Sequence, residues 1–536
     1  MESNARMRWS GIAAGMATAL ALSAFAAIAV TGLWRPDAFD YAQIARELAA
    51  GNGFASRQLI YELHLRFLQT NGLLDGPWPN LHRFPLPSVA MAAWFLLVGV
   101  GDHAVALYGI LFQALTSGLL FVWAQRAIGL AAAVAASLLF TANGVMLETG
   151  CSGLAEPPAM FFFTLSLFAL WQRDGVTRPR RALAAGVALG LASLARTSIA
   201  TALPAVLLGT LCGKRAAPDR GARATAGAVA LLGFALAVSP WLLRNQTVAG
   251  TPLFSLHSYF LLPAGTGERP GRLDKWDASL PWVRDFVPAS EFASRHGDDL
   301  GRKWRRNARE LLSDYPTFGG TRLLPLLAPA AMVVVVGAGL RPIAWVAGGS
   351  FLLNAVAVSF TDMYFDKYYF HLLPMLVLFA VAVLWRAARV LPAGRVRTAV
   401  FFAVVVSLVP WRDLAAAAGR VRIAGRQVVP AHMRYIDTHT PADAIIFSDQ
   451  SYAVTWMTGR RSIRRHIERR QDGRPVLSAL RFDTEYLPIA GVYLSRFDMR
   501  DPQIAAALAH AGEDGRFRER FPHHKTFRDG AVFYYR

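Results

Sequence analysis

The sequence has few cysteines, few charged residues and little acid relative to base. Cys151 and Cys212 are its two cysteines, which excludes a disulfide framework or a cysteine-rich metal site. Charged residues make up 17% of the 536 residues and hydrophobic residues 54%, and the mean hydropathy is +0.32. Such values are typical of a protein that crosses a membrane many times rather than of a soluble enzyme.

The excess of basic over acidic residues indicates which partners the protein can have. The 36 acidic residues are outnumbered by 56 basic ones, and the formal net charge is +20. In a soluble protein this excess would indicate a nucleic-acid partner. In a membrane protein it is typical of Lys and Arg in cytoplasmic loops and of contact with anionic headgroups. We therefore expect membrane lipids as partners and no nucleic acid.

Long apolar runs predict about eleven membrane-spanning helices. The first run, 11–33, is expected to be an uncleaved first span rather than a signal peptide. The run 182–213 is too long for one span and is interrupted near Arg196, so it is predicted to form two short spans. The other predicted spans are 104–124, 127–145, 157–172, 223–243, 321–340, 342–360, 366–386 and 396–412.

Charge decides the orientation of these spans. If the short run 86–101 crossed the membrane, the basic loops 172–181 and 213–223 would fall outside, against the positive-inside rule. We therefore predict that 86–101 lies along the outer interface. The N-terminus is then cytoplasmic and the C-terminus extracytoplasmic, in a multi-pass protein of the cell (inner or plasma) membrane.

Four regions are predicted on the outer side. They are the first outer loop (34–103), a turn (148–158), a second long loop (244–320) and the C-terminal tail. The chain is thus predicted to consist of a transmembrane domain, 1–412, and a small extracytoplasmic α/β domain, 413–536. The fold class is mostly α, with this α/β domain at the end of the chain.

The tail contains strand patterns. The segments 444–449 and 490–495 are predicted as buried strands, and the last seven residues as a third strand in a hairpin with 516–521. Helical patterns lie between them.

The first outer loop begins with a helical pattern. Tyr41, Ile44, Ala45 and Leu48 recur at helical spacing, and the glycines at 51 and 53 would end the helix. A second amphipathic helix is predicted near 59–68 and would lie at headgroup level. A structural interpretation of the opening acids is that Asp37 caps the first helix, with Asp40 at the third helical position.

Charged residues concentrate at the predicted outer face. Few of them fall at the middle of a predicted span, which disfavours an ion-coupled transporter. The pattern favours chemistry at the outer interface on a substrate with a lipid tail.

Several segments resemble the GT-C superfamily, membrane glycosyltransferases that use polyprenyl-phosphate-linked sugars. Within that superfamily, these segments are most similar to those of the aminoarabinose transferase and protein O-mannosyltransferase group. PDAFDYAQIARELAAGNGF (36–54) resembles the start of the first outer loop of that superfamily, with an Asp, a Tyr four residues on and a helix ending at Gly. The later similar blocks are RFPLPSVAMAAWFLLVG (83–99), ETGCSGLAEPPAMFFF (148–163), LGLASLARTS (189–198), SPWLLRNQTVAG (239–250) and FDKYYFHLLPMLVLF (365–379). The last block has Lys367 where the family usually has Arg.

The resemblance implies an activity and a set of site residues. A hexosyl or pentosyl group would pass from a polyprenyl-phosphate donor to an envelope lipid, glycan or protein in one inverting displacement. The resemblance implies Asp37 as general base, with Asp40 and Glu156 as further candidate catalytic carboxylates. The implied substrate-binding residues are Tyr41, Arg83, Arg196, Arg244 and Lys367, with the cations placed to stabilise the leaving phosphate.

Other interpretations of these residues stay open. Arg83 and Arg244 can also be interfacial anchors, and His82, His257 and His371 look isolated and are interpreted as packing residues. No cofactor or metal is predicted, although outer carboxylates could bind a divalent cation. The alternative functions are a lipid or sugar transporter or flippase, a membrane scaffold, and a related polymerase or ligase.

Overall fold

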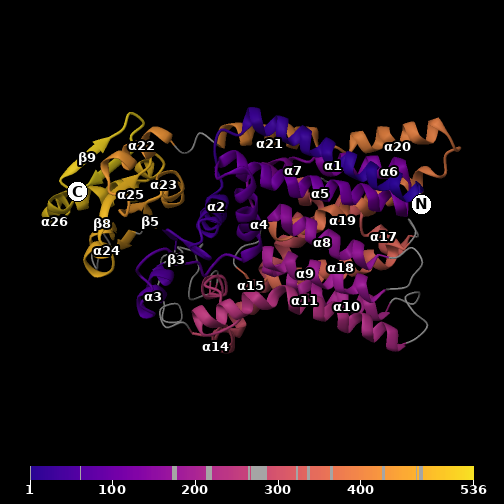
Figure 1. Ribbon diagram of the computed structural model, residues 1–536, viewed down its shortest axis with the longest axis horizontal. Coiled ribbons are helices and arrows are strands. Elements are labelled where there is room, and N and C mark those ends of the chain that lie inside the picture. Colours follow the sequence, from indigo (N-terminus) through magenta and orange to yellow (C-terminus); the bar gives the residue numbers. More distant parts are fainter. Residues whose placement is uncertain are drawn as a thin grey trace.

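The computed structural model describes residues 2–60, 62–171, 178–212, 220–263, 266, 287–320, 324–334, 339–361, 366–424, 429–465, 467–469 and 475–536. A body of long helices occupies most of its length, and a smaller mixed sheet lies at one end (Figure 1). The N-terminus and the sheet lie at opposite ends of the long axis (Figure 1). The predicted fold class, a mostly helical multi-pass membrane protein with a small C-terminal α/β region, is confirmed.

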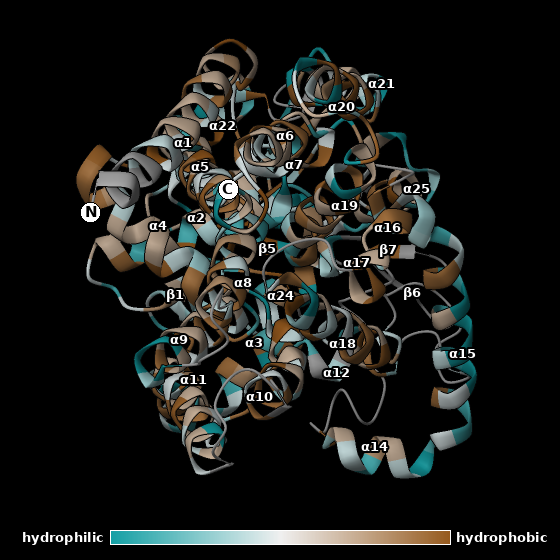
Figure 2. Cartoon of the chain, turned by 90° about the vertical axis from the view of Figure 1, so that its right-hand side faces the viewer, coloured by the Kyte–Doolittle hydropathy of each residue, from teal (hydrophilic) through white to brown (hydrophobic). Residues whose placement is uncertain are grey.

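Within the described residues, five helices are long and apolar enough to cross a membrane. Hydrophobic residues cover much of their surface (Figure 2), and α11 leaves large leucines such as Leu236 and Leu243 exposed, as expected for a face that meets lipid. The five are α1 (Glu2–Ala29), α5 (Asp102–Ala127), α11 (Arg220–Ala249), α18 (Leu340–Val358) and α19 (Leu373–Ala388).

Two further apolar helix pairs are bent. The pair α6 (Leu130–Thr141) and α7 (Gly144–Cys151) is bent by 63° where Asn143 caps α7 by accepting from two backbone N–H groups. The pair α20 (Arg395–Ser407) and α21 (Trp411–Ala424) is bent by 46° beside Pro410, which lacks a backbone N–H. Counting each pair as one span gives up to seven.

Shorter helices complete the body, and small residues let some of them pack closely. In the pair formed by α9 and α11, a Cβ added to Gly186 would lie 1.9 Å from the Ala230 carbonyl oxygen, so only glycine permits this approach. The shorter elements are α4 (Pro85–Val98), α8 (Glu156–Leu170), α9 (Pro179–Ala195), η1 (Thr197–Ala202), α10 (Leu203–Cys212), α16 (Leu324–Leu327) and α17 (Ala330–Val333).

The sidedness of the body remains a prediction. The number of spans, the position of α4 along the interface and the domain boundary at 412/413 are likewise predictions that the structure leaves open. The basic loops 172–181 and 213–223, which carried the orientation argument, lie largely outside the described residues.

The first outer loop contains the two helices predicted for it, α2 (Pro36–Ala49) and α3 (Glu62–Thr70). It also contains three short strands, β1 (Ala55–Ser56), β2 (Gln58–Leu59) and β3 (Trp78–Pro79). In the second long loop, the described elements are α12 (Ser258–Leu261), α14 (Ala289–Arg295), α15 (Gly297–Asp314) and η2 (Tyr315–Gly320). Helix α15 is largely hydrophilic and runs along the rim of the molecule (Figure 2).

The C-terminal sheet has six strands in the order β2-β5-β4-β8-β10-β9. The predicted strands are present as β4 (Ile445–Ser448), β8 (Ile489–Leu494) and β10 (Val532–Tyr535). Strand β5 (Arg461–Arg464) is parallel to β4 and β2, so the first outer loop supplies the edge strand.

The predicted hairpin partner of the last strand was wrong. Segment 516–521 largely forms the helix α26 (Gly515–Arg520), and β10 pairs instead with β9 (His523–Thr526). Phe517 lies on the buried side of this helix, and Phe521 is buried directly after its end. Their spacing therefore reflects a helix rather than a strand.

The helices of the C-terminal region connect and cover these strands. They are α22 (Pro430–His439), α23 (Ser451–Thr458), α24 (Ala479–Glu485), η5 (Asp498–Arg500) and α25 (Pro502–Glu513). A separate pair, β6 (Ile467–Arg469) and β7 (Pro475–Leu477), lies between β5 and α24 in the chain.

Candidate active site

The candidate site is built on the first turn of α2, directly after the chain leaves α1. Pro36 occupies the first helical turn, and the N-cap residue is Arg35, whose side chain makes no capping bond. The interpretation of Asp37 as N-cap was therefore wrong. Proline at the first position sets the backbone for a helix start without a cap, which leaves both nearby carboxylates available for other contacts.

Arg83 links the two carboxylates of this turn. Its Nη2 lies 2.7 Å from Asp37 Oδ1 and its Nε 2.5 Å from Asp40 Oδ2. The same guanidinium lies over the Tyr41 ring, with 5.0 Å from Cζ to the ring centroid. Segments more than 40 residues apart in the sequence thus meet at one cation, as the fork geometry of arginine allows.

Asp40 lies in a closed compartment behind this arginine. Its side chain is fully buried, and His82 Nε2 lies 2.7 Å from Oδ2. Burial alone would raise the pKa of Asp40, but the neighbouring His82 and Arg83 outweigh it and lower the pKa to about 2. Asp40 is therefore a carboxylate that carries its charge at all physiological pH values.

His82 belongs to a group of histidines that sequence reasoning missed. Its ring centroid lies 6.0 Å from that of His64 and 5.9 Å from that of His257. The interpretation of His82 and His257 as isolated was wrong, because a long loop brings them together. Three histidines spread over 64–257 carry no spacing that could have predicted this contact.

Asp37 is open where Asp40 is closed. Its side chain is 36% exposed, against 0% for Asp40. Lys367, in the short turn η3 (Asp366–Tyr368), places its Nζ 3.4 Å from Asp37 Oδ2. A partly exposed carboxylate with two cations beside it can meet a substrate and a phosphate at the same place.

Tyr41 and a second ion pair lie close to this group. Burial raises the pKa of the Tyr41 phenol to about 12, and the charges of Arg83, Asp37, Arg196 and Glu156 all act on it. The hydroxyl therefore stays neutral and can donate a hydrogen bond. Its electrostatic neighbours include residues from four separate segments of the chain.

Glu156 and Arg196 form the second ion pair. The Arg196 guanidinium contacts a Glu156 carboxylate oxygen, and both side chains are largely buried. Arg196 also lies over the Tyr368 ring, 5.0 Å from Cζ to the centroid, so it adjoins the turn that carries Lys367. Glu156 is thus satisfied by an internal cation rather than open to a substrate.

Arg244 takes a different position from the other predicted cations. Its Nη2 donates to the carbonyl oxygens of Asn80 (2.9 Å) and Phe54 (3.4 Å), and it lies over the Trp241 ring. It thus fastens the first outer loop to the end of α11. No contact between Arg244 and Asp37 is present in the described part of the chain, and its predicted role toward phosphate stays a prediction.

The acidic and histidine side chains of the site, within the described part of the chain, are not arranged as metal ligands. Among the described residues, no group of three or more His, Cys, Asp or Glu side chains is arranged to hold a metal ion. Glu148 pairs with Arg35, two residues before Asp37, and with Arg420.

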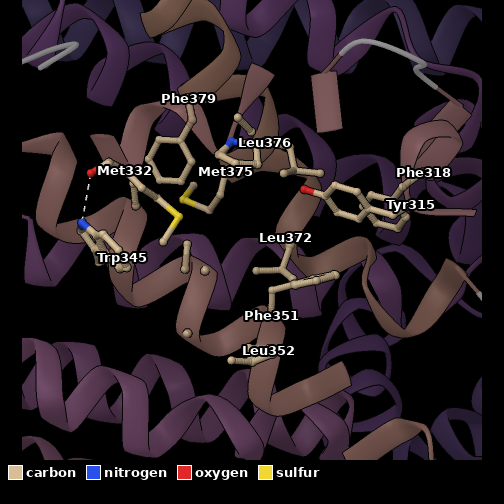
Figure 3. A pocket seen from close by; sticks show the side chains of 16 residues that line it. Tyr315, Phe318, Met332, Trp345, Phe351, Leu352, Leu372, Met375, Leu376 and Phe379 are labelled. Carbon is tan, nitrogen blue, oxygen red and sulfur yellow. Dashed lines mark hydrogen bonds between the residues drawn. The ribbon is translucent and has the colours of Figure 1, made fainter. Parts of the chain in front are cut away.

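An apolar cavity of about 380 Å³ lies beside the turn that carries Lys367. Tyr315 and Phe318 lie at one end, and Trp345 and Met332 at the other (Figure 3). Tyr369, two residues after Lys367, packs its ring 5.6 Å from that of Phe351, a lining residue. The cavity thus follows α18 and α19, and part of its lining packs against the segment that follows Lys367.

Part of the chain matches a known protein family. The family model "Dolichyl-phosphate-mannose-protein mannosyltransferase" matches residues 79–243, less than a third of the chain. No curated protein sequence matches the chain.

Solved structures match over nearly the full length. ArnT from Cupriavidus metallidurans in the apo state has a TM-score of 0.57 at 14% identity, covering 97% of this chain and 96% of that one. The same protein bound to undecaprenyl phosphate has a TM-score of 0.56 at 14% identity, covering 97% of each chain. The archaeal oligosaccharyltransferase AglB from Archaeoglobus fulgidus, in complex with an inhibitory peptide and a dolichol-phosphate, has a TM-score of 0.57 at 13% identity, covering 97% of this chain and 74% of that one.

At such identities the structural likeness shows the fold alone. The fold is that of the GT-C superfamily, and the resemblance predicted from the sequence is confirmed. Together with the family match over residues 79–243, it supports the predicted class of protein, a multi-pass membrane glycosyltransferase. Which sugar, acceptor and residues are involved is a matter for proposal.

Proposed function

We propose that this chain transfers a sugar from a polyprenyl-phosphate donor to an envelope lipid, glycan or protein at the extracytoplasmic face. The observation that carries the proposal is the meeting of Asp37, Arg83 and Lys367. They come from three distant segments, and the carboxylate among them is partly exposed. A base and two phosphate-binding cations are what such a transfer requires.

The proposed step is a single displacement with inversion. The acceptor hydroxyl oxygen attacks the anomeric carbon while the bond from that carbon to the phosphate oxygen breaks. The hydroxyl proton passes to the Asp37 carboxylate, and polyprenyl phosphate leaves with the bonding electron pair. A positioned base of this kind contributes about 10²–10⁴-fold to the rate.

The leaving phosphate gains negative charge, so cations must be in place beforehand. Arg83 is held by Asp40 through Nε, which leaves its terminal nitrogens directed toward the Asp37 side. Lys367 lies farther from Asp37, at 3.4 Å, and is the cation that a phosphate can engage most easily. Arg196 supports this turn through Tyr368.

Asp40 and Glu156 take positioning roles in this proposal rather than the catalytic roles predicted from the sequence. Each is almost fully buried and already bonded to an arginine. A carboxylate in that state orients its cation and has no access to an acceptor hydroxyl. The Tyr41 ring packs against the Arg83 guanidinium and limits its movement. Its neutral hydroxyl is proposed to bond the sugar.

The donor tail is proposed to lie in the apolar cavity between α18 and α19. Its volume falls within the range of small-molecule sites, and its lining is hydrophobic and aromatic. The amphipathic helices of the first outer loop, predicted to lie at headgroup level, are the alternative place for the tail. The cavity is the better candidate because it ends beside Tyr369 and so brings a phosphate at its mouth close to Lys367.

The test is transfer from labelled polyprenyl-phosphate sugars in membrane vesicles, with label followed into lipid, glycan and protein fractions. We expect transfer by the natural protein and loss of transfer in Asp37→Asn at equal protein level. Glu148→Gln is the matched control, because it removes a carboxylate that pairs with Arg35 and Arg420, neither of which is a cation in contact with Asp37.

The fraction that gains label identifies the acceptor class. Equal transfer by the natural protein and Asp37→Asn would contradict the base assignment. Movement of intact donor across the membrane without transfer, with a broad panel of donors, would favour the flippase alternative.

A further inference from the structure

The carboxyl edge of the C-terminal sheet gathers charged side chains that the proposed reaction does not use. Strands β4, β5 and β8 are parallel, with β4 between the other two. The chain passes from β4 to β5 on one side and then to β8 on the other. The carboxyl ends of β4 and β8 therefore border a topological switch point, where open α/β sheets bind their ligands.

Hydrogen bonds hold the three strand ends together at this edge. Asp449 follows β4, and it accepts bonds from the backbone N–H (2.9 Å) and the hydroxyl (2.5 Å) of Ser495, which follows β8. Arg465 follows β5; it donates from its backbone N–H to the Ser448 carbonyl oxygen and pairs through its side chain with Asp498. The edge is therefore a fixed polar surface rather than a set of independent loops.

Arg464, the last residue of β5, has a half-buried side chain that makes no hydrogen bond or ion pair with the described part of the chain. Burial and the charges of Asp449 and Asp498 raise the pKa of the nearby Tyr452 phenol to about 12, and the Arg464 charge opposes this rise. The Tyr452 hydroxyl donates to the Gln450 side-chain oxygen at 2.8 Å. An uncommitted guanidinium thus adjoins a hydroxyl and an amide.

The edge lies level with the first turn of α2, which carries Asp37. Near the start of both helices, the Phe39 ring on α2 lies 5.1 Å from the Tyr452 ring on α23. Near their ends, Arg46 donates to the carbonyl oxygens of Thr455 and Trp456. The two helices therefore run side by side in the same direction. Since α23 starts at the carboxyl end of β4, that end lies level with the first turn of α2.

The sheet is also fixed to the helical body. The Trp456 indole donates to the Asp102 carboxylate at the start of α5 (2.6 Å), and β2 of the first outer loop pairs with β5. A molecule bound at the edge would thus keep one position relative to Asp37.

We propose that this edge binds the acceptor through an anionic group, a phosphate on a hydroxyl-rich headgroup. The inference rests on the proposed function, because it makes the edge the acceptor subsite of the same reaction. Arg464 takes the phosphate, since its planar fork matches phosphate oxygens. Gln450 and Tyr452 bond the hydroxyl groups and orient the acceptor toward Asp37.

The test measures equilibrium binding of labelled glucose 6-phosphate to the full-length protein in lipid nanodiscs. We expect Arg464→Ala to weaken binding at least tenfold and Arg464→Lys to weaken it less. Arg461→Ala is the matched control, because Arg461 begins the same strand at the opposite edge. We expect it to bind as the natural protein does.

Two further binding measurements show whether the phosphate or the sugar of the probe is recognised. Unphosphorylated glucose should bind at least tenfold more weakly than glucose 6-phosphate, and inorganic phosphate should compete with it. Equal affinity of Arg464→Ala and the natural protein, or no binding by the natural protein, would overturn the proposal. Asp37→Asn should bind normally, so loss of the base assignment and loss of the subsite give different results.

Discussion

Two carboxylates three residues apart on α2 lie in opposite surroundings. Asp37 is 36% exposed and lies between Arg83 and Lys367, whereas Asp40 is fully buried against His82 and the other side of the same arginine. A carboxylate can take a proton from a substrate only if the substrate reaches it. The proposal therefore assigns the reaction to the open side and the holding of the arginine to the closed side.

The same contrast extends to Glu156. It resembles Asp40 in being buried and in contact with one arginine, and differs from Asp37 in having no exposed face. Among the three candidate carboxylates, one is therefore open and two are closed. Replacing each in turn should separate a loss of rate from a loss of stability.

The largest expected effect is on the open acid. We expect Asp37→Asn to lower the initial transfer rate by about 10²–10⁴-fold, the contribution of a positioned general base. Its unfolding temperature should change little, because the side chain is partly exposed. Initial rates with labelled donor in proteoliposomes measure the first quantity, and a thermal unfolding scan the second. A rate within a factor of two of the natural protein would assign Asp37 to structure.

Asp40→Asn should instead lower stability. It leaves a buried arginine and histidine without their carboxylate, and removal of one partner from a buried pair costs about 3–5 kcal/mol. We expect a loss near 3 kcal/mol because Arg83 keeps its contact with Asp37. Denaturant unfolding in detergent measures this change. An unchanged free energy of unfolding would show that the contacts of Asp40 with Arg83 and His82 do not stabilise the protein.

The pH dependence of stability should reveal the buried carboxylate of Asp40. The pKa of Asp40 is lowered from its ordinary value of 3.8 to about 2, so its stabilising contribution is complete above pH 3.8 and is lost as the pH falls toward 2. The shift corresponds to about 2 kcal/mol. The stability difference between the natural protein and Asp40→Asn should therefore narrow by this amount between pH 5 and pH 2. A constant difference would contradict the lowered pKa.

The smallest expected effect is on Lys367. Its Nζ lies 3.4 Å from Asp37, and it is partly exposed. We expect Lys367→Ala to slow transfer about tenfold, equal to about 1.4 kcal/mol of lost transition-state stabilisation. Lys367→Arg should keep most of the rate, since arginine binds phosphate equally well. A rate for Lys367→Arg as low as that for Lys367→Ala would indicate that shape, not charge, matters there.

The sequence predicted the open side better than the closed one. Asp37, Arg83 and Lys367 lie in segments whose order along the chain resembles a known superfamily, and the fold brings all three together. Their separation of more than 300 residues could not be bridged by periodicity or spacing. The resemblance supplied that link, and the apolar runs supplied the class of fold.

The role of Asp40 could not be predicted from the sequence, because it depends on the burial of its side chain. Asp40 and Asp37 look alike as residues of one helical turn, and only the packing of the loop around His82 separates them. The edge strand β2 was missed because two residues, Gln58 and Leu59, are too few to show alternation. Strand β9 was missed because all four of its residues are exposed and polar, so no hydrophobic signal marks it.

The measurement that tests the central claim most directly compares Asp37→Asn with Asp40→Asn in a single-turnover transfer assay. Each variant is reconstituted in proteoliposomes and assayed the same interval below its own unfolding temperature, so that both are folded. The account predicts a rate at least 100-fold below the natural one for Asp37→Asn and a rate within about tenfold of it for Asp40→Asn. Equal losses in both, or a larger loss in Asp40→Asn, would contradict the division between an open reacting side and a closed supporting one.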